Sequence, residues 1–429
     1  MDTGSRIILS SFTSYTLVVV LLLLTLPGTF VHSSLRAQVL LQTPSRDSAI
    51  SDELDSLTLS VLESHNELLD PHSFFYPFSF RPSDSLAIRL RALLPDSLVD
   101  RSSDEAAFFP MLVHWVHERW MHDSFNSIAM HATSLEILAR AARGERFTCV
   151  EYAKVMTDML VSFGYAARMV GLSRRNISNP RLGARHVVTE VWSCKHRKWM
   201  MLDAQFGSYA ERSGTPLHVA ELQESLRTGD SSTMLLVADA RGFTTQRVGD
   251  STVYTSMLRN LDAFVDIPYV INNKVGVLMH VPADRNEPLL FQGQVMTNTQ
   301  YTKKLTDLYA PLGDVHIDLT YSAQGPKRTQ AILHPVYEVT TTTAYPFTRY
   351  MEISIDGGPW KRVNEHRTTW TLHRGENSIA TRTVCYSGCT TKPASMVVFY
   401  GLRKDAREAR RKRTATTPMN APVPGDAHR

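Results

Sequence analysis

The stretch GERFTCVEYAKVMTDMLVSFGYAARMVG, residues 144–171, decides the fold of the region around it. Its apolar residues recur at spacings of three and four, which predicts a helix with one buried face. They are Val150, Ala153, Met156, Met159, Leu160 and Phe163. Thr148 is the expected N-cap, Glu151 its capping-box partner and Gly164 the C-terminal stop. Cys149 therefore falls on the first helical turn, where free N–H groups and the helix dipole favour a thiolate.

Three strands are predicted after this helix, at residues 165–172, 185–192 and 199–203. The polar connection at residues 193–198 makes a hairpin of the last two. If Trp192 pairs with Trp199, His186 becomes the diagonal neighbour of Asp203 on one face. Diagonal neighbours lie about 7–8 Å apart, within reach of an imidazole and a carboxylate. A slip of one residue in this register would place the two on opposite faces.

Together these residues predict a catalytic triad. Cys149 is the expected nucleophile, His186 the base and then the acid, and Asp203 the group that orients the imidazole. A cysteine alone is usually a small buried apolar residue, and a histidine on a strand is usually structural. The prediction therefore rests on the three occurring together.

The segments that carry these residues resemble the transglutaminase-like superfamily, whose papain-like core has Cys, His and Asp in this chain order. The matching pieces are TSLEILARAARGERF, FTCVEYA, GYAARMVG, HVVTEVW and KWMMLDAQFG, within residues 110–210. FTCVEYA and HVVTEVW are also similar to the peptide:N-glycanase branch, although the paired CxxC zinc ligands usual there do not occur. Thr148 stands where Gly often precedes the cysteine, and Ala204 where Pro often follows the aspartate. The subfamily therefore stays open.

The resemblance implies acyl transfer on protein or peptide amide bonds through a thioester on Cys149. Water as the acceptor gives hydrolysis and a lysine amine gives a crosslink, so peptidase, amidase and protein-glutamine crosslinking activities all stay open. No cofactor is required. The alternative is a non-catalytic transglutaminase-like binding or scaffold protein of the cell envelope.

Four histidines, His114, His117, His122 and His131, lie close together in the sequence before this helix. His114 and His117 precede Glu118, but the pattern is not HExxH and no third ligand follows at a fixed spacing. We therefore expect no metal site.

Composition excludes few classes. The chain has 429 residues and is 43% hydrophobic, enough for two or three domains with cores of their own. A net charge of +4 gives no reason to expect a nucleic acid partner. Four cysteines are too few for a disulfide scaffold. Cys385 and Cys389 are spaced to close a small loop in an oxidising compartment, with Cys194 left unpaired.

The N-terminus predicts export. Residues 16–26 are an apolar run of eleven, too short for a bilayer core that needs about 20 residues. Pro27 and Gly28 follow, and residues 31–33 suit cleavage by signal peptidase. We expect a cleaved signal peptide and a secreted, periplasmic or cell-envelope protein. An uncleaved signal anchor is the alternative, and only then would a membrane be a partner.

The fold class predicted is α+β: a papain-like core, with N-terminal helices packed on an antiparallel sheet, followed by all-β, Ig-like sandwich material. Helices are expected around Leu57 and Leu90, at residues 106–121 and at residues 255–264. Short strands with turn signals between them begin near Asp266. The last part, residues 403–429, is basic and is expected to be disordered, with contact to a cell-envelope polymer as the possible role.

The predicted division of the chain has five parts. They are a signal peptide (1–33), a linker with N-terminal helices (34–105), the catalytic domain (106–265), a β-rich region ending in an Ig-like domain (266–402), and the basic tail (403–429).

Overall fold

A computed structural model describes most of the chain beyond its N-terminal segment. The described residues are 57–70, 80–128, 132–174, 185–239, 242–247, 253–261, 264–271, 274–287, 290–291, 294–295, 298–322, 334–363 and 366–416. The chain divides into two units at Asp52, and all described residues belong to the second. The predicted signal peptide and the linker at 34–56 lie outside the described residues.

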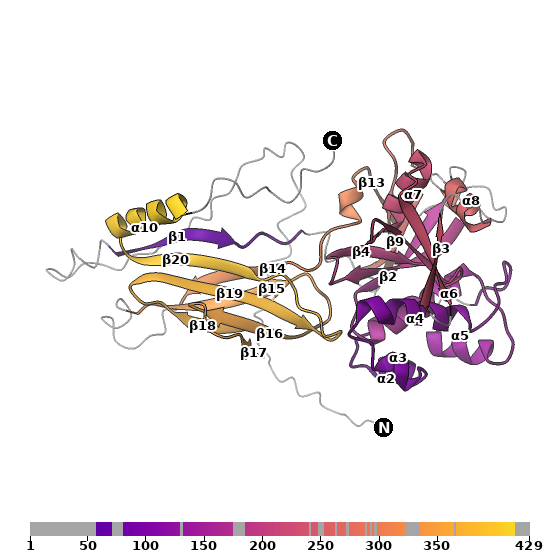
Figure 1. Ribbon diagram of the computed structural model, residues 1–429, viewed down its shortest axis with the longest axis horizontal. Helices are drawn as coiled ribbons and strands as arrows, with labels where there is room; N and C mark the ends of the chain where they lie inside the picture. The colour runs from indigo at the N-terminus through magenta and orange to yellow at the C-terminus, as the bar shows by residue number, and fades with distance from the viewer. Residues whose placement is uncertain are drawn as a thin grey trace, which may run out of the picture. The chain divides into compact units, whose positions relative to one another are not determined.

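In the first half of this unit, helices that precede α6 (Cys149–Ser162) in the chain pack against it (Figure 1). The helices before it are α2 (Ser85–Arg91), α3 (Asp96–Val99), α4 (Glu105–His117) and α5 (Ser134–Ala141). Those after it are α7 (Val219–Thr228) and α8 (Val253–Asn260). The predicted cap residues are correct, because Thr148 and Glu151 form a capping box. Gly164 ends the helix with φ +85°, which glycine adopts without strain.

A six-stranded sheet packs against α6. Its strand order is β13-β10-β9-β2-β3-β4, from strands β2 (Ala167–Ser173), β3 (Arg185–Ser193), β4 (Lys198–Leu202), β9 (Phe264–Ile271), β10 (Lys274–His280) and β13 (Thr299–Thr302). The predicted hairpin register is confirmed, since Trp192 pairs with Trp199. That register fixes which face of the hairpin carries each side chain.

This sheet does not end where the catalytic domain was predicted to end. The boundary between residues 265 and 266 cuts through β9, which pairs with β2, and β10 and β13 extend the same sheet. Period-two alternation looks the same in a core sheet and in a sandwich, so it could not separate the two.

Smaller elements complete this part. A four-stranded sheet has the order β6-β5-β7-β8, and β11 pairs with β12. The bounds are β5 (Ser208–Arg212), β6 (Thr215–Pro216), β7 (Thr233–Asp239), β8 (Gly242–Arg247), β11 (Leu290–Phe291) and β12 (Gln294–Val295), with the 3₁₀ helix η2 (Leu305–Asp307).

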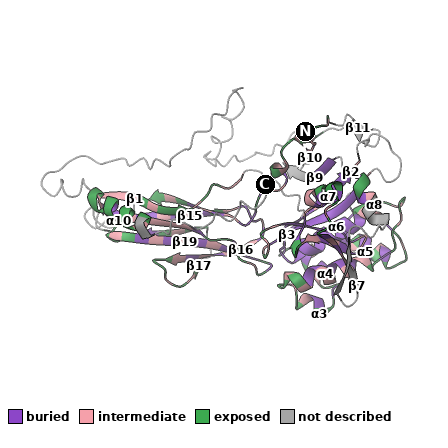
Figure 2. Ribbon diagram, turned by 45° about the horizontal axis from the view of Figure 1, so that its top comes forward, coloured by how far each residue is buried: buried purple, intermediate pink, exposed green. Residues whose placement is uncertain are grey.

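The β-rich region consists of two sheets around a second core. Their orders are β1-β20-β19-β16-β17 and β14-β15-β18. The strands are β1 (Leu57–His65), β14 (Val315–Tyr321), β15 (Val336–Thr343), β16 (Thr348–Ile355), β17 (Lys361–Val363), β18 (Arg367–Thr371), β19 (Gly375–Cys385) and β20 (Ala394–Leu402). Buried residues of both sheets, among them Trp370 and Val398, form one cluster (Figure 2). The prediction of an α+β core followed by a β-rich region is confirmed.

Two elements differ from their predictions. The segment around Leu57 is strand β1, not a helix, and it pairs antiparallel with β20. Residues Arg403–Thr416 of the supposedly disordered tail form helix α10, which lies on β1 and β20 (Figure 1). Arg413 pairs with Glu63 and Glu376, and Arg410 donates to the Val61 carbonyl. These contacts and the buried Ala406 side chain hold the helix on the sheet.

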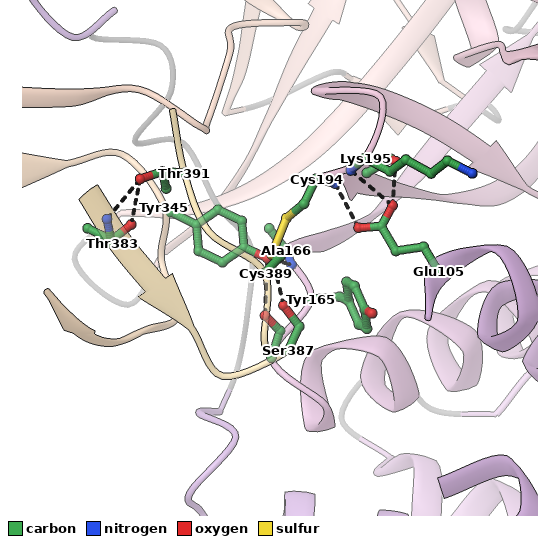
Figure 3. Close-up of a disulfide and its surroundings, with 12 residues drawn as sticks. Glu105, Tyr165, Ala166, Cys194, Lys195, Tyr345, Thr383, Ser387, Cys389 and Thr391 are labelled. Carbon is green, nitrogen blue, oxygen red and sulfur yellow. Dashed lines mark hydrogen bonds between the residues drawn. A yellow bond between two sulfur atoms is a disulfide. The ribbon is translucent and has the colours of Figure 1, made fainter. Parts of the chain in front are cut away.

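The predicted disulfide is also wrong. Cys389 forms a disulfide with Cys194, which lies in the β3–β4 turn (Figure 3). Cys385 is a buried free thiol. The bond therefore joins the β3–β4 hairpin to the sandwich. Glu105 of α4 holds the same turn, accepting hydrogen bonds from the Cys194 and Lys195 backbone N–H groups at 2.8 and 3.3 Å.

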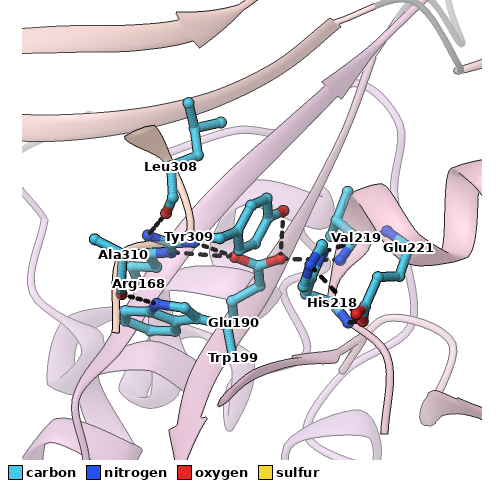
Figure 4. Close-up of polar contacts among 9 residues, drawn as sticks. All are labelled: Arg168, Glu190, Trp199, His218, Val219, Glu221, Leu308, Tyr309 and Ala310. Atoms are coloured by element: carbon cyan, nitrogen blue, oxygen red, sulfur yellow. Dashed lines mark hydrogen bonds and ion pairs between the residues drawn. The ribbon is translucent and has the colours of Figure 1, made fainter. Parts of the chain in front are cut away.

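A buried ion pair fixes the chain between the core sheet and the sandwich (Figure 4). Arg168 of β2 and Glu190 of β3 lie 2.7 Å apart and are 4% and 0% exposed. Arg168 also donates to the Leu308 carbonyl at 2.7 Å, and Glu190 accepts from the Tyr309 hydroxyl at 2.9 Å. Burial and the Glu190 charge raise the pKa of Tyr309 well above its usual value, so this hydroxyl remains a donor. The segment leading to β14 is thereby clamped to the core.

Among the described residues, no helix is both long and apolar enough to cross a membrane.

Candidate active site

Cys149 is the first residue of α6, at the end of an approach fixed by hydrogen bonds. The Thr148 hydroxyl accepts from the Val150 N–H at 3.2 Å, and the Glu151 carboxylate accepts from the Thr148 N–H at 3.0 Å. The thiol is partly exposed and is not in a disulfide. The helix thus presents a free thiol at the positive end of its dipole, with access from solvent.

Glu151 has a second task. It is 2% exposed, and its other oxygen accepts from the Ser127 hydroxyl at 2.7 Å and the Ile128 N–H at 2.9 Å. One carboxylate therefore holds both the start of α6 and the loop at residues 121–128. The capping-box pattern pointed to Glu151, but nothing in the sequence pointed to the second contact.

His186 is brought to Cys149 by the packing of α6 on β3. The Thr189 hydroxyl donates to the Ala153 carbonyl at 3.0 Å, which sets the helix against the strand. His186 is 2% exposed, and Cys149 lies close enough to raise the pKa of its ring. The first pair of the predicted triad is therefore in contact.

Asp203 follows β4 and completes the arrangement. Its Oδ2 lies 2.7 Å from His186 Nε2, which leaves Nδ1 as the ring nitrogen for Cys149. Its Oδ1 accepts from the backbone N–H groups of Gln205 and Phe206 at 3.0 and 3.2 Å. Both carboxylate oxygens are thus held, and the imidazole is oriented by a fixed acceptor. The structure brings all three predicted residues together.

The electrostatics favour a charged imidazole. Burial alone lowers the pKa of His186, but the Asp203 charge, the hydrogen bonds to Asp203 and Cys149, and the Cys149 charge outweigh it and raise the pKa to about 10. At neutral pH the ring is therefore an imidazolium between a carboxylate and a sulfur.

Two further side chains at the site were not assigned to it from the sequence. The Phe206 ring meets the His186 ring edge-on, with centroids 5.7 Å apart. His122 lies beside Phe147 in a short parallel bridge. Burial and the charge of His186 lower the pKa of His122, against opposing effects of Asp123 and Asp203, so this imidazole is neutral. The sequence contains no pattern that predicts the position of the loop carrying His122. His122 could therefore not be assigned to the site from the sequence.

The tryptophans of this region pack against other side chains. Trp120 meets Phe147 edge-on at 5.7 Å and lies 4.4 Å from the Tyr152 ring, and its Nε1 is buried with no hydrogen bond to any described residue. Trp115 lies under the Arg119 guanidinium.

The helix histidines are not gathered at a metal site in the described structure, which holds no group of three potential His, Cys, Asp or Glu ligands. His117 Nδ1 lies 3.2 Å from the Ala204 carbonyl, and its ring packs over Gly207. It therefore supports the turn that follows Asp203.

Comparison with known proteins gives the family of this region. The family model described as the transglutaminase-like superfamily matches residues 97–204. These residues form a transglutaminase-like core. The match begins in α3 and ends one residue after Asp203, so it contains Cys149, His186 and Asp203.

Other comparisons add less. The chain matched no curated protein. Among solved structures it is similar to red sea bream transglutaminase, with 9% sequence identity, a TM-score of 0.24, and coverage of 75% of this chain and 73% of that chain.

Proposed function

We propose that this chain is a cysteine enzyme that transfers the acyl group of protein or peptide amides through a thioester on Cys149. The observation that carries the proposal is the contact of Cys149 with His186 and of His186 with Asp203, inside a transglutaminase-like core.

The chemistry follows from the charges. The Cys149 thiolate attacks the carbonyl carbon of a carboxamide, and the C–N bond breaks as His186 gives its proton to the departing amine. The raised pKa of His186 keeps that proton available at neutral pH. Water or an amine then attacks the thioester, and His186 takes the proton of the attacking group. No metal or nucleotide is required for these steps.

The oxyanion needs donors at the same place. The Cys149 backbone N–H points out of the first turn of α6, as first-turn N–H groups do. His122 is a second candidate donor, since it is neutral and lies near the pair. Each such donor contributes about 3–4 kcal/mol to transition-state stabilisation in comparable enzymes.

Thiol labelling tests the proposal. Iodoacetamide should alkylate Cys149 quickly near neutral pH and leave Cys385 unlabelled, because burial raises the pKa of Cys385 to about 12. His186→Ala should slow the labelling of Cys149. Cys149→Ala should abolish both amine release and the incorporation of a labelled primary amine into a glutamine-containing protein, without loss of folding. Slow labelling that His186→Ala does not change would favour a binding or scaffold protein.

We also propose that the protein is exported, on the strength of the apolar run at residues 16–26. Mass analysis of protein recovered from its natural host should find an N-terminus at Ser34. A full-length chain in the soluble cytoplasm would contradict this proposal.

A further inference from the structure

Three large apolar side chains near the start of α6 lie outside the hydrophobic core. Met121 is 65% exposed, Phe125 81% and Val150 38%. None of the three belongs to a hydrophobic cluster of the described residues. Single exposed apolar residues are ordinary, but several at one place mark a contact site.

Hydrogen bonds place these residues near the start of α6. Val150 is the next residue after Cys149 on α6. The loop that carries Met121 and Phe125 runs along the entry to that helix, because the Asp123 N–H donates to the Phe147 carbonyl at 2.9 Å. Further along, the loop is bonded to Glu151 through its residues 127 and 128. The loop therefore borders the helix end at which Cys149 lies.

Hydrogen bonds hold the backbone of this loop, and Ile128 at its end packs against the core. Asp123 Oδ1 accepts from the N–H groups of Phe125 and Asn126 at 2.8 and 3.3 Å. The Asn126 side chain donates to the Arg146 carbonyl at 2.7 Å. The Phe125 ring and the Met121 thioether take part in none of these contacts, while the backbone that carries them is held in place.

We propose that Met121 and Phe125 form a subsite for a large apolar side chain of the acyl donor, next to the carbonyl that Cys149 attacks. This inference rests on the proposed function, since a donor lies there only if Cys149 attacks a carbonyl. The occupant is a peptide with leucine, phenylalanine or methionine beside the reacting group.

Alkylating amides test the subsite without requiring turnover. The probes are N-bromoacetyl-leucinamide and N-bromoacetyl-serinamide, with iodoacetamide as the reference. In each reaction the Cys149 sulfur forms a bond to carbon and a halide ion leaves. Mass spectrometry of the full chain measures the rate at Cys149. The leucine probe should react about tenfold faster than the serine probe, the ratio expected from partial burial of one leucine side chain.

The variant Met121→Ala/Phe125→Ala should lose this preference and keep its iodoacetamide rate. The matched control is Ile88→Ala/Leu93→Ala, which removes two apolar residues that are 54% and 47% exposed elsewhere, and it should keep the preference. If iodoacetamide reacts at Cys149 but leucine has no advantage, or keeps it in the Met121→Ala/Phe125→Ala variant, the subsite is overturned and the proposed function stands. If iodoacetamide does not react, the proposed function fails and the subsite fails with it.

Discussion

His186 is almost fully buried and yet carries a proton at neutral pH. Burial of an isolated imidazolium is unfavourable, so the charge persists only because Asp203 and Cys149 lie on either side of it. The two carboxylate oxygens of Asp203 are in turn held by one side chain and two backbone N–H groups. The protonation state of the site therefore depends on the turn after β4 as much as on the histidine.

The pH dependence of activity tests this arrangement. Because the pKa of His186 is raised from 6.5 to about 10, kcat/KM should hold through neutral pH and fall as the pH rises through about 10. Asp203→Asn removes the largest favourable effects, so the falling limb should move to lower pH. An unchanged limb in Asp203→Asn would contradict the assignment.

The same pKa shift makes the stability of the fold depend on pH. A folded-state pKa above the unfolded value of 6.5 stabilises the fold fully below pH 6.5, and this contribution is lost as pH rises toward about 10.

His122 is the residue on which the oxyanion proposal depends. His122→Ala removes this neutral N–H donor and should lower kcat by about 10²–10³ with little change in KM. His122→Gln, which keeps an N–H donor, should recover part of the rate. His373→Ala, an exposed histidine of the β-rich region, is the control and should have no effect. A KM change alone would assign His122 to substrate binding instead.

Sequence patterns could predict the triad residues but not their surroundings. Cys149 is identified by a helix start, and His186 and Asp203 by a hairpin, because each signal is local. Phe206 and the second contact of Glu151 depend on how a loop folds over the site, and no local spacing encodes that. The partner of Cys389 is missed for the same reason, since Cys194 lies 195 residues away.

At the scale of elements, the buried Arg168–Glu190 pair joins β2, β3, α7 and the segment leading to β14. Glu190 also accepts from the Val219 N–H at 2.9 Å, and the Arg168 guanidinium lies 3.9 Å from the Trp199 ring centroid. Removing one partner would leave a buried charge with nothing to balance it.

Glu190→Leu should therefore destabilise the protein by about 3–5 kcal/mol. Arg168→Met/Glu190→Leu should recover much of that loss, because no charge is left buried. Urea unfolding measures both, with Glu67→Leu, which changes an exposed carboxylate, as the control. Equal losses in the single and double variants would show that packing, not charge, is the cause.

Elements that follow from local patterns could be predicted from the sequence, whereas elements that depend on distant partners could not. Helix α6 and the β3–β4 hairpin follow from patterns within 20 or so consecutive residues, and they were predicted correctly. The segment of β1 carries leucines whose spacing also fits a helix, and only its pairing with β20 decides the outcome. α10 was missed because its sequence is highly charged. It packs on the sheet through the buried Ala406 and through the ion pairs of Arg413 with Glu63 and Glu376.

At the scale of the whole molecule, one disulfide joins the β3–β4 hairpin to the sandwich. The noncovalent contacts at the same junction include the Tyr345 hydroxyl, which donates to the Gly164 carbonyl at 3.1 Å. Gly164 has no room for a side chain there, since a Cβ would lie 2.4 Å from that of Tyr386. The junction is therefore closely packed as well as crosslinked.

Cys194→Ser should destabilise the protein by about 2–4 kcal/mol under oxidising conditions, because the bond closes a long loop. Under reducing conditions the variant and the native chain should unfold at similar urea concentrations. Cys385→Ser should leave the Cys194–Cys389 crosslink intact in peptide mapping. A crosslink between Cys385 and Cys389 in the native chain would contradict the structure.

β1 comes before the transglutaminase-like core and β20 after it, and the Glu63–Arg413 ion pair joins residues 350 apart. During synthesis the ribosome therefore releases β1 long before its partner exists. At a synthesis rate of about 5–20 residues per second, β1 remains without its partner β20 for tens of seconds. The core that contains Cys149 can fold during this time. The sandwich can form only after β20 has been synthesised. A nascent chain stalled before β20 should accordingly contain a protease-resistant core and an unprotected first strand.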